Sequence, residues 1–404
     1  MEQVLYPLPD GWSWQQLSDV VDKTENLNPL KHADQLWTYI DISSVDRDRF
    51  TITDPKEILG KDAPSRAKKH IQLNDVIFAT TRPNLKNIAL IREEYSSPVA
   101  STGFCIFRAN VKVLPTYLFY FVTTDFVQAQ IEPYVGGASY PAITDANLKK
   151  APIPIPSIEE QKRIVEKLDA LLTRIDTAIE HLQESITLAD SLFESSQSEI
   201  FNDVLTKYQH STIDEICTVT SSKRIFKADY VESGIPFYRT KEIVDLSKER
   251  DLSTELFIDK DKYLEISDKF GVPKKGDLLF SAVGTIGVMW IVDEREFYFK
   301  DGNLLWLKDM NGVIPEYLKS AISAVLTEKI KDRSQGAAYK AISITNLKAF
   351  EIPLPSIEEQ KLTVAKIEHV SSLTKKTKQE IRLQINDLQK LKASILDSAF
   401  KGEL

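Results

Sequence analysis

Two long stretches of the chain place apolar residues at three- and four-residue steps with polar residues between them. They run from 157 to about 206 and from 356 to about 400, and neither contains glycine or proline. A sustained three-four spacing with polar flanks is typical of a coiled-coil seam. The pattern therefore predicts two long helices, each spanning about 65–75 Å at about 1.5 Å per residue. The alternative is two separate amphipathic helices, each packed on its own domain.

The expected seam positions are apolar residues and one threonine. In the first helix they are Ile164, Leu168, Leu171, Ile175, Ala178, Leu182, Ala189, Phe193, Ile200 and Val204, and in the second Ile367, Leu373, Thr377, Ile381, Ile385, Leu388, Leu391, Ile395 and Ala399.

Both helices have the same start signal. Ile-Pro-Ile-Pro and Ile-Pro-Leu-Pro precede them, and alternate prolines keep the chain extended. Ser157 then stands three residues before Glu160, and Ser356 three before Glu359. This is the spacing of a capping box, in which the hydroxyl and the carboxylate each accept a backbone N–H of the first turn.

The rest of the chain forms two bodies, which we call the first body (1–156) and the second body (207–355). Short apolar runs between turn residues predict strands at Val76–Ala79, Ile88–Ile91 and Phe104–Phe107. Leu114–Gln130, which opens with a proline, is typical of a helix. Each body is thus expected to mix helices and strands.

An internal repeat connects the two halves. Residues 137–162 and 336–361 are identical at seventeen of 26 positions, including the unbroken PSIEEQK. Weaker echoes join Asp75-x-x-Phe78 to Asp277-x-x-Phe280 and Pro115-x-Tyr117-Leu118 to Pro315-x-Tyr317-Leu318. A period of about half the chain indicates two copies of a whole domain followed by a helix.

Charge is distributed unevenly along the 404 residues, whose net charge is −8. Residues 157–206 carry eleven acidic and four basic side chains, whereas 356–404 carry seven acidic and nine basic. The two helices therefore complement each other as partners. Because the acidity is concentrated in one helix, the bodies can still present local basic surfaces to nucleic acid.

The location inferred from the sequence is the cytoplasm. Cys105 and Cys217 lie far apart without a CxxC pair, which suits a reducing compartment. The start of the chain lacks the pattern of a signal peptide. The longest apolar stretch, Leu278–Val292, is too short to span a membrane.

No catalytic or metal-binding constellation is evident. Asn28-Pro29-Leu30 lacks the second proline and the aromatic residue of an adenine-methyltransferase motif, and indicates a turn. Gly284-x-x-Gly287 lacks the Gly-Lys-Ser/Thr of a phosphate loop. The five histidines are isolated and have no ligand spacing.

Candidate DNA contacts lie in loops that combine basic, amide and aromatic side chains. Arginine suits guanine, and asparagine suits adenine, in the major groove. The alternative for each loop is an ordinary solvated turn. In the first body the candidates are Thr81, Arg82, Asn84, Lys86 and Tyr140; in the second they are Lys223, Arg224, Tyr238, Arg239, Lys241, Tyr339 and Lys340.

The repeated junction, in which Asn-Leu-Lys is followed by Pro-x-Pro-Ser-x-Glu-Glu-Gln-Lys and a long helix, resembles the specificity subunits of Type I restriction–modification systems over essentially the whole chain. The resemblance implies an α+β fold: two target-recognition domains (1–156 and 207–355) in a pseudo-two-fold repeat, separated by antiparallel conserved helices (157–206 and 356–404) that form a coiled coil. Each domain would read half of a bipartite, asymmetric site on double-stranded DNA.

The resemblance also implies partners and cofactors. Two methyltransferase subunits would dock on the scaffold and restriction subunits would join them, with S-adenosylmethionine in the methyltransferase and ATP and Mg in the restriction subunit. This chain itself would hold no cofactor and perform no catalysis. Because the repeated junction must dock identical partners, its candidate partner-binding residues are Glu160, Gln161, Glu359 and Gln360. The rival interpretations are a two-armed protein-interaction scaffold without DNA readout and a fused methyltransferase.

Overall fold

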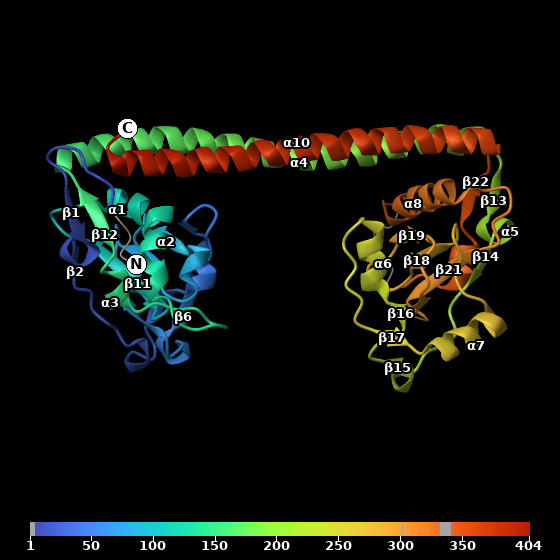
Figure 1. Cartoon of the computed structure of the whole chain (residues 1–404), viewed down its shortest axis with the longest axis horizontal. Coiled ribbons are helices and arrows are strands. Elements are labelled where there is room, and N and C mark those ends of the chain that lie inside the picture. Colours follow the sequence, from blue (N-terminus) through green and yellow to red (C-terminus); the bar gives the residue numbers. More distant parts are fainter. Residues whose placement is uncertain (1–4, 301, 332–340) are drawn as a thin grey trace. The chain divides into compact units, whose positions relative to one another are not determined.

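The computed structural model describes residues 5–300, 302–331 and 341–404. Its contacts divide the chain into two compact units. Unit 1 comprises the residues up to Glu184 together with Ile381–Leu404, and unit 2 comprises Ser185–Glu380. Both units combine helices with small mixed sheets (Figure 1). The α+β fold is therefore confirmed.

In unit 1 the first body contains sheets of order β2-β11-β8-β9, β6-β3-β10-β7 and β1-β12. The predicted strands at Val76, Ile88 and Phe104 are present, and the central strands are buried because they are apolar on both faces. The elements are β1 (Ser13–Gln16), β2 (Val21–Asp22), η2 (Pro29–Lys31), β3 (Leu36–Ile40), η3 (Ile42–Ser44), β4 (Val45–Asp46), β5 (Thr51–Ile52), β6 (Lys56–Leu59), η4 (Gly60–Asp62), β7 (Ala67–His70), β8 (Val76–Ala79), η5 (Pro83–Leu85), β9 (Ile88–Leu90), β10 (Pro98–Ser101), β11 (Phe104–Ala109), α1 (Pro115–Val122), α2 (Asp125–Ile131), α3 (Asp145–Leu148) and β12 (Pro152–Ile155).

In unit 2 the second body contains sheets of order β14-β21-β18-β19, β15-β17-β16-β20 and β13-β22. The elements are β13 (His210–Thr212), α5 (Ile213–Ile216), β14 (Thr218–Thr220), η7 (Lys227–Asp229), β15 (Tyr230–Val231), β16 (Ile235–Tyr238), α6 (Thr240–Ser247), β17 (Phe257–Ile258), α7 (Lys260–Phe270), β18 (Leu278–Ser281), β19 (Met289–Ile291), β20 (Tyr298–Phe299), β21 (Leu304–Lys308), α8 (Pro315–Lys331), α9 (Ile344–Lys348) and β22 (Glu351–Pro353).

The internal repeat extends through both bodies. The order β2-β11-β8-β9 matches β14-β21-β18-β19, and each second sheet contains one parallel pair, β3 with β10 and β16 with β20. The buried hydroxyl of Tyr117 donates to the carbonyl of Pro154 at 2.9 Å, and that of Tyr317 donates to Pro353 at 2.9 Å. The Pro-x-Tyr-Leu echo in the sequence therefore marks a hydrogen bond that both copies use.

The bodies differ around this shared frame. Strand β7 extends the second sheet of the first body beyond β10, whereas β15 extends that of the second body beyond β17, at the opposite edge. Helices α6 and α7 follow β16 and β17, where the first body has the short 3-10 helices η3 and η4 after β3 and β6. The same frame thus carries different outer elements.

Both long helices are confirmed, as α4 (Ile158–Lys207) and α10 (Ile357–Lys401). At α10 the capping box is complete, since the Ser356 amide donates to the Glu359 carboxylate at 3.4 Å and the Glu359 amide donates to the Ser356 hydroxyl at 3.3 Å. At α4 the Glu160 amide donates to the Ser157 hydroxyl at 3.3 Å, but its carboxylate bonds Arg163 instead. The predicted reciprocal box is therefore only half formed at α4.

The helix predicted over Leu114–Gln130 is interrupted. Helix α1 ends at Val122 and α2 begins at Asp125. The hydroxyl of Thr124 accepts a hydrogen bond from the amide of Val127 at 3.4 Å and caps α2. A threonine at this position favours the start of a new helix, because its hydroxyl accepts a hydrogen bond from a backbone amide of the first turn that has no carbonyl partner within the helix.

Within each unit, α4 and α10 pack antiparallel. In unit 1, Lys392 donates to both carboxylate oxygens of Asp176 at 2.7 and 2.8 Å. In unit 2, Lys378 donates to Asp190. Arg163 reaches Leu404 in unit 1 and Tyr208 reaches Glu359 in unit 2, so within each unit the two helices run in opposite directions.

The seam of α10 differs from the sequence expectation. Leu373, Thr377 and Leu391 are exposed, whereas the side chains of Lys378 and Lys392 are each only 20% exposed. The predicted seam positions of α10 are wrong here because Leu373 and Leu391 lie on a face of the helix beside the one that packs against α4. Polar residues within a seam fix its register at some cost in stability.

The end of each long helix enters the core of a body. Phe400 of α10 packs against Tyr117 and Phe121 of α1, with ring centroids 5.1 Å apart in both pairs. Phe201 of α4 packs against Tyr317 of α8 at 5.9 Å. Each body is therefore completed by residues of a helix end.

Candidate nucleic-acid interface

The turn between β8 and β9 holds the first candidate residues in a fixed shape. Arg82 and Lys86 both adopt left-handed backbone conformations, with φ of 49° and 51°, on either side of η5. Such conformations are uncommon for residues other than glycine and persist where the surroundings enforce them. Here the amide of Arg82 donates to the carbonyl of Pro141 at 2.7 Å, and Thr81 forms a β-bridge with Ala142.

That bridge brings together two candidates that are far apart in the sequence. The guanidinium carbon of Arg82 lies over the ring of Tyr140, 5.4 Å from its centroid. Tyr140 is 72% exposed, and Arg82 and Asn84 are also exposed. A cation stacked on an aromatic ring is restrained without losing its hydrogen-bond donors. Arg82, Asn84 and Tyr140 therefore form an exposed group that can contact a nucleic acid.

Lys86 has a different role. Its ammonium group donates to the carbonyl of Thr123 at 2.9 Å and to the carboxylate of Asp125 at 2.6 Å. These bonds tie the turn to the start of α2. Because these bonds engage its ammonium group within the body, Lys86 has a structural role, and its DNA contact stays a prediction.

The corresponding turn of the second body, between β18 and β19, repeats the backbone joint without the cation. Val283 forms a β-bridge with Ala341, and the amide of Ile342 donates to Ala282 at 2.9 Å, as Ile143 does to Thr80. The turn itself reads Ala-Val-Gly-Thr. The candidates Tyr339 and Lys340 lie outside the described residues.

Two further candidates in the second body belong to its interior. Tyr238 is 2% exposed and stacks on Phe297 with ring centroids 4.7 Å apart, so its predicted DNA contact is wrong. Arg239 donates to the buried carboxylate of Glu242 at 2.8 Å and to Glu255 at 3.1 Å. These hydrogen bonds raise the pKa of Arg239, which is therefore assigned to neutralising Glu242.

Lys241 pairs with the same exposed carboxylate. Its ammonium group lies 3.3 Å from Glu255. Hydrogen bonds from Arg239 and from Lys241 lower the pKa of Glu255. Because Glu255 pairs with both Arg239 and Lys241, the positive charge that these residues offer to an anionic ligand is smaller than the sequence suggested.

The remaining candidates, Lys223 and Arg224, lie in the exposed loop between β14 and β15. The ammonium group of Lys223 sits over the ring of Phe270, 5.2 Å from its centroid. Sequence reasoning missed two exposed aromatic residues here, Phe226 and Phe270. An aromatic next to a basic pair is the signal that could have identified them.

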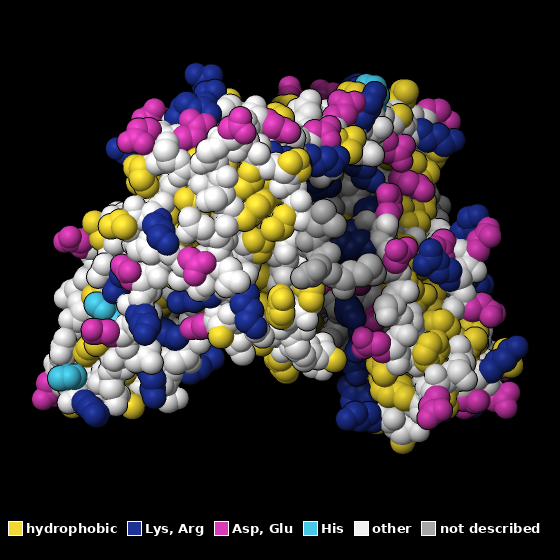
Figure 2. All heavy atoms as spheres, turned by 60° about the vertical axis from the view of Figure 1, so that its left-hand side comes forward, with side chains coloured by type: hydrophobic (Ala, Val, Ile, Leu, Met, Phe, Trp, Pro, Cys, Tyr) yellow, Lys and Arg dark blue, Asp and Glu magenta, His cyan; other side chains and the backbone are white. Residues whose placement is uncertain are grey.

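Basic side chains also gather on the first body. In Figure 2, Lys and Arg side chains lie on the left-hand body toward the end remote from the helices. The exposed basic residues of its loops and edges include Lys23, Lys31, Lys61, Arg66 and Lys68. An overall acidic chain thus has a locally basic surface, as nucleic-acid binding requires.

The repeated glutamines of the junction are buried. Gln161 is fully buried; its side-chain oxygen accepts from the Leu114 amide at 2.8 Å, and its nitrogen donates to the carbonyls of Lys112 and Pro156 at 2.9 and 3.1 Å. Gln360 makes the same set of bonds in unit 2. Their predicted partner contact is therefore corrected: they lock each helix onto its body.

The glutamates beside them remain accessible but are engaged. Glu160 bonds Arg163, which also donates to the carbonyl of Leu404 at 2.8 Å. Glu359 accepts a bond from the hydroxyl of Tyr208 at 2.5 Å. Both glutamates stay candidate partner contacts, each with an internal partner.

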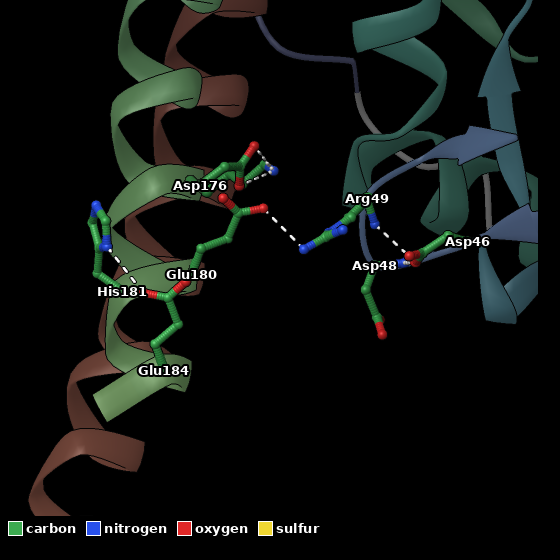
Figure 3. Close-up of polar contacts among 8 residues, drawn as sticks. Asp46, Asp48, Arg49, Asp176, Glu180, His181 and Glu184 are labelled. Atoms are coloured by element: carbon green, nitrogen blue, oxygen red, sulfur yellow. Dashed lines mark hydrogen bonds and ion pairs between the residues drawn. The ribbon is translucent and has the colours of Figure 1, made fainter. Parts of the chain in front are cut away.

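Each body also contacts a long helix through an ion pair. Figure 3 shows Arg49 reaching from the segment between β4 and β5 to Glu180 of α4, 2.9 Å away, while Asp46 accepts the Arg49 amide and fixes the segment. In unit 2 the polarity is reversed, because Glu249 accepts from Lys375 of α10 at 3.1 Å.

Chemistry is sparse among the described residues. Burial raises the pKa of the Cys105 and Cys217 thiols to about 12, so neither is a nucleophile at neutral pH. In this part of the chain no group of three or more His, Cys, Asp and Glu side chains is arranged to hold a metal ion. Nor does any helix within the described ranges have the length and apolar character needed to cross a membrane.

Comparisons with known proteins agree on one family. The model of the type I restriction modification DNA specificity domain matches twice, over residues 9–188 and 206–386. A putative type I restriction enzyme specificity subunit of Haemophilus influenzae is 28% identical over 70% of this chain and 71% of its own length.

Two solved structures match nearly the whole chain. One, from a study of complex assembly and conformational transition of the type I R-M system, is 31% identical with a TM-score of 0.78 and covers 99% of this chain and 100% of its own. The other is the crystal structure of the HsdS subunit from Thermoanaerobacter tengcongensis, 31% identical with a TM-score of 0.56, covering 99% of each chain.

Proposed function

The chain belongs to the family of type I restriction modification DNA specificity domains and is a specificity subunit, not a catalytic one; from this premise we propose that it reads a bipartite, asymmetric DNA site. The observation that carries the proposal is the double match, with one specificity domain in each half of the chain. Two bodies that share the order of one sheet but differ in their outer elements suit two different half-sites.

In this proposal the first body reads its half-site with the turn after β8. The exposed guanidinium of Arg82 can donate two parallel hydrogen bonds to a guanine, and the amide of Asn84 can pair with an adenine. The ring of Tyr140 restrains Arg82 before DNA arrives, which reduces the entropy lost on binding. The second body, whose corresponding turn is neutral, would use other elements.

The partners supply the chemistry. Two methyltransferase subunits that use S-adenosylmethionine would dock on the repeated junctions, and restriction subunits that use ATP and Mg would join them in the cytoplasm. The chain would bind no cofactor itself. Partly exposed, helix-starting Glu160 and Glu359 occupy the same place in both junctions, which supports docking of two identical partners.

Mapping of N6-methyladenine across the genome, in cells with and without this gene, tests the proposal. We expect methylation that depends on the gene at a motif of two defined parts separated by unspecified bases. A continuous motif, or methylation unchanged by loss of the gene, would contradict bipartite reading.

The paired helices provide a second test, because their length would set the number of unspecified bases. In unit 2, Asp190 of α4 pairs with Lys378 of α10, so a deletion of Thr187–Asp190 is matched by a deletion of four residues of α10 that begins at Lys378. Deleting both segments removes about one turn, roughly 5.4 Å, while keeping the helices paired. We expect the motif to keep both defined parts and lose one base of spacer.

A deletion of Thr187–Asp190 alone is the matched control. It removes the partner of Lys378 and shifts the rest of α4 along α10, so we expect weaker helix pairing and reduced methylation. For the double deletion, a methylated motif with changed half-site bases and the original spacer would contradict the prediction. It would show that the helices affect which bases are read and not the distance between the half-sites.

A further inference from the structure

The loop between β14 and β15 holds an aromatic side chain rigidly toward solvent. Phe226 is 65% exposed. On one side the amide of Lys223 donates to the hydroxyl of Tyr298 at 2.6 Å, and on the other the Phe226 amide donates to the carboxylate of Asp229 at 2.8 Å. Between them Ile225 is buried in the core of the second sheet. The backbone is thus anchored, and Phe226 does not fold inward.

The surroundings of this ring are basic. Three exposed basic residues are close to it in the sequence: Lys223 lies three positions, Arg224 two positions and Lys227 one position from Phe226. A ring held outward beside cations is the combination on which nucleic-acid bases stack. The cations suit a polyanion, and the aromatic suits its bases.

The first body presents an apolar tip at the same place in the repeat. After β2, which corresponds to β14, helix η2 displays Leu30, 48% exposed, next to the exposed Lys31. This turn is clamped, because a side chain at Gly60 would lie 2.0 Å from the carbonyl oxygen of His32. Both copies therefore carry an apolar residue followed by lysine at a 3-10 turn, with Leu30 inside η2 and Phe226 directly before η7.

We propose that Phe226 is an apolar wedge that enters the DNA of the half-site read by the second body, with Leu30 as the equivalent wedge of the first. This inference rests on the proposed function and deepens it. Apolar side chains of this kind enter the minor groove, partly unstack a base step and kink the duplex. Lys223 and Lys227 neutralise the phosphates beside the opened step. The second body thereby reads deformability where the first reads guanine with Arg82.

DNA is favoured over a protein as the occupant. A protein-docking patch would gain from a broad apolar area, whereas here one projecting ring has the exposed Lys223 and Lys227 within three positions in the sequence. Three other candidates among the described residues of the second body support this assignment, because Tyr238 is buried and Arg239 and Lys241 are bound to carboxylates. Within the described residues, this loop is the strongest basic and aromatic surface left to that body.

The test uses the full chain in complex with its methyltransferase partner and a duplex bearing the mapped motif. 2-Aminopurine, whose fluorescence rises when it unstacks, replaces a base at each step of the second half-site in turn. We expect one step to brighten with the unchanged complex and not with Phe226→Ala. Affinity should fall about tenfold in that variant, since one stacked base contributes about 1–3 kcal/mol. Phe226→Trp should retain both signals.

Two further variants separate the contributions. Lys227→Ala should lower the slope of log affinity against log salt by about 1, whereas Phe226→Ala should leave that slope unchanged. Leu264→Ala removes an exposed leucine of α7, outside the loop, and should change neither affinity nor fluorescence.

Each contrary result has a distinct meaning. Unchanged affinity and fluorescence in Phe226→Ala, with sequence-specific binding intact, would overturn the wedge and leave the proposed function standing. Loss of methyltransferase assembly in Phe226→Ala without DNA would make the tip a protein contact. If the unchanged complex bound all duplexes equally, the proposed function itself would fail.

Discussion

The turn between β8 and β9 in the first body carries Arg82, held against the exposed ring of Tyr140, whereas the matching turn between β18 and β19 in the second body is small and neutral. The backbone joint beneath the two turns is nevertheless the same, with Ile143 and Ile342 donating to equivalent carbonyls at 2.9 Å. The hydrogen bond that anchors each turn therefore persists, while the turn above it has diverged, since η5 is present in the first body and has no counterpart in the second.

The same division holds at the junctions. The buried glutamines Gln161 and Gln360 make equivalent bonds in the two units, but the ion pairs between body and helix have opposite polarity, Arg49 with Glu180 and Glu249 with Lys375. A buried amide with three bonds tolerates no substitution without leaving polar groups unpaired. An exposed ion pair can reverse its charges at little cost, so it diverges freely.

The largest expected effect concerns the two arginines that sequence reasoning treated alike. Arg239→Ala leaves the carboxylate of Glu242, which is 1% exposed, without its main cation, so we expect the free energy of unfolding to fall by about 3 kcal/mol. Urea unfolding of the purified chain measures it. Lys241→Ala, which removes only an exposed pair, should cost less than about 1 kcal/mol. Unchanged stability with weaker DNA binding would return Arg239 to the interface.

Arg82→Ala should have the opposite profile. Because the guanidinium is exposed and stacked, its removal should leave the unfolding free energy nearly unchanged but cost about 1–3 kcal/mol of binding to the motif. Discrimination should relax in one half-site only, which methylation mapping and competition binding would detect. Arg82→Lys keeps the charge without the fork and should restore nonspecific affinity more than discrimination. Equal weakening on every sequence would mark Arg82 as a phosphate contact.

The smallest expected effect concerns the reversed ion pairs. Arg49→Glu places two carboxylates together and should lower the unfolding free energy by less than about 1 kcal/mol, since both side chains are more than half exposed. Adding Glu180→Arg should recover the loss. The corresponding pair in unit 2, Glu249→Lys with Lys375→Glu, should behave alike. A loss much above 1 kcal/mol in either unit would show that these pairs are fixed structural contacts and not freely diverging ones.

Local signals in the sequence predicted the frame well. Proline, serine and glutamate at fixed spacing marked the starts of α4 and α10, and apolar runs marked β8, β9 and β11. These features depend on neighbouring residues, whose spacing is visible in a sequence. The face of α10 that packs against α4 depends on the partner helix and is not visible in local spacing. Leu373 and Leu391 were predicted to lie in the seam but are exposed, whereas Lys378 and Lys392 occupy it.

The candidate site was less predictable, since exposure and long-range pairing decide it. Tyr238 and Arg239 have the composition of a DNA-contacting loop, but burial and Glu242 determine their role. The contact between Arg82 and Tyr140 joins segments far apart in sequence, through a bridge that no local spacing shows. Phe226 was overlooked because the sequence does not show whether a single phenylalanine is buried in a core or exposed to solvent.

The packing of Phe400 against Tyr117 and Phe121 has a consequence for folding kinetics. Unit 2 is one continuous segment, and Phe201 directly precedes the body it completes, whereas the core of unit 1 includes residues from both sides of that segment. Contacts of high sequence separation must pay a larger loop-closure entropy before they form. We expect the second body to nucleate first, so that an intermediate with Tyr117 and Phe121 uncovered is the form most exposed to aggregation.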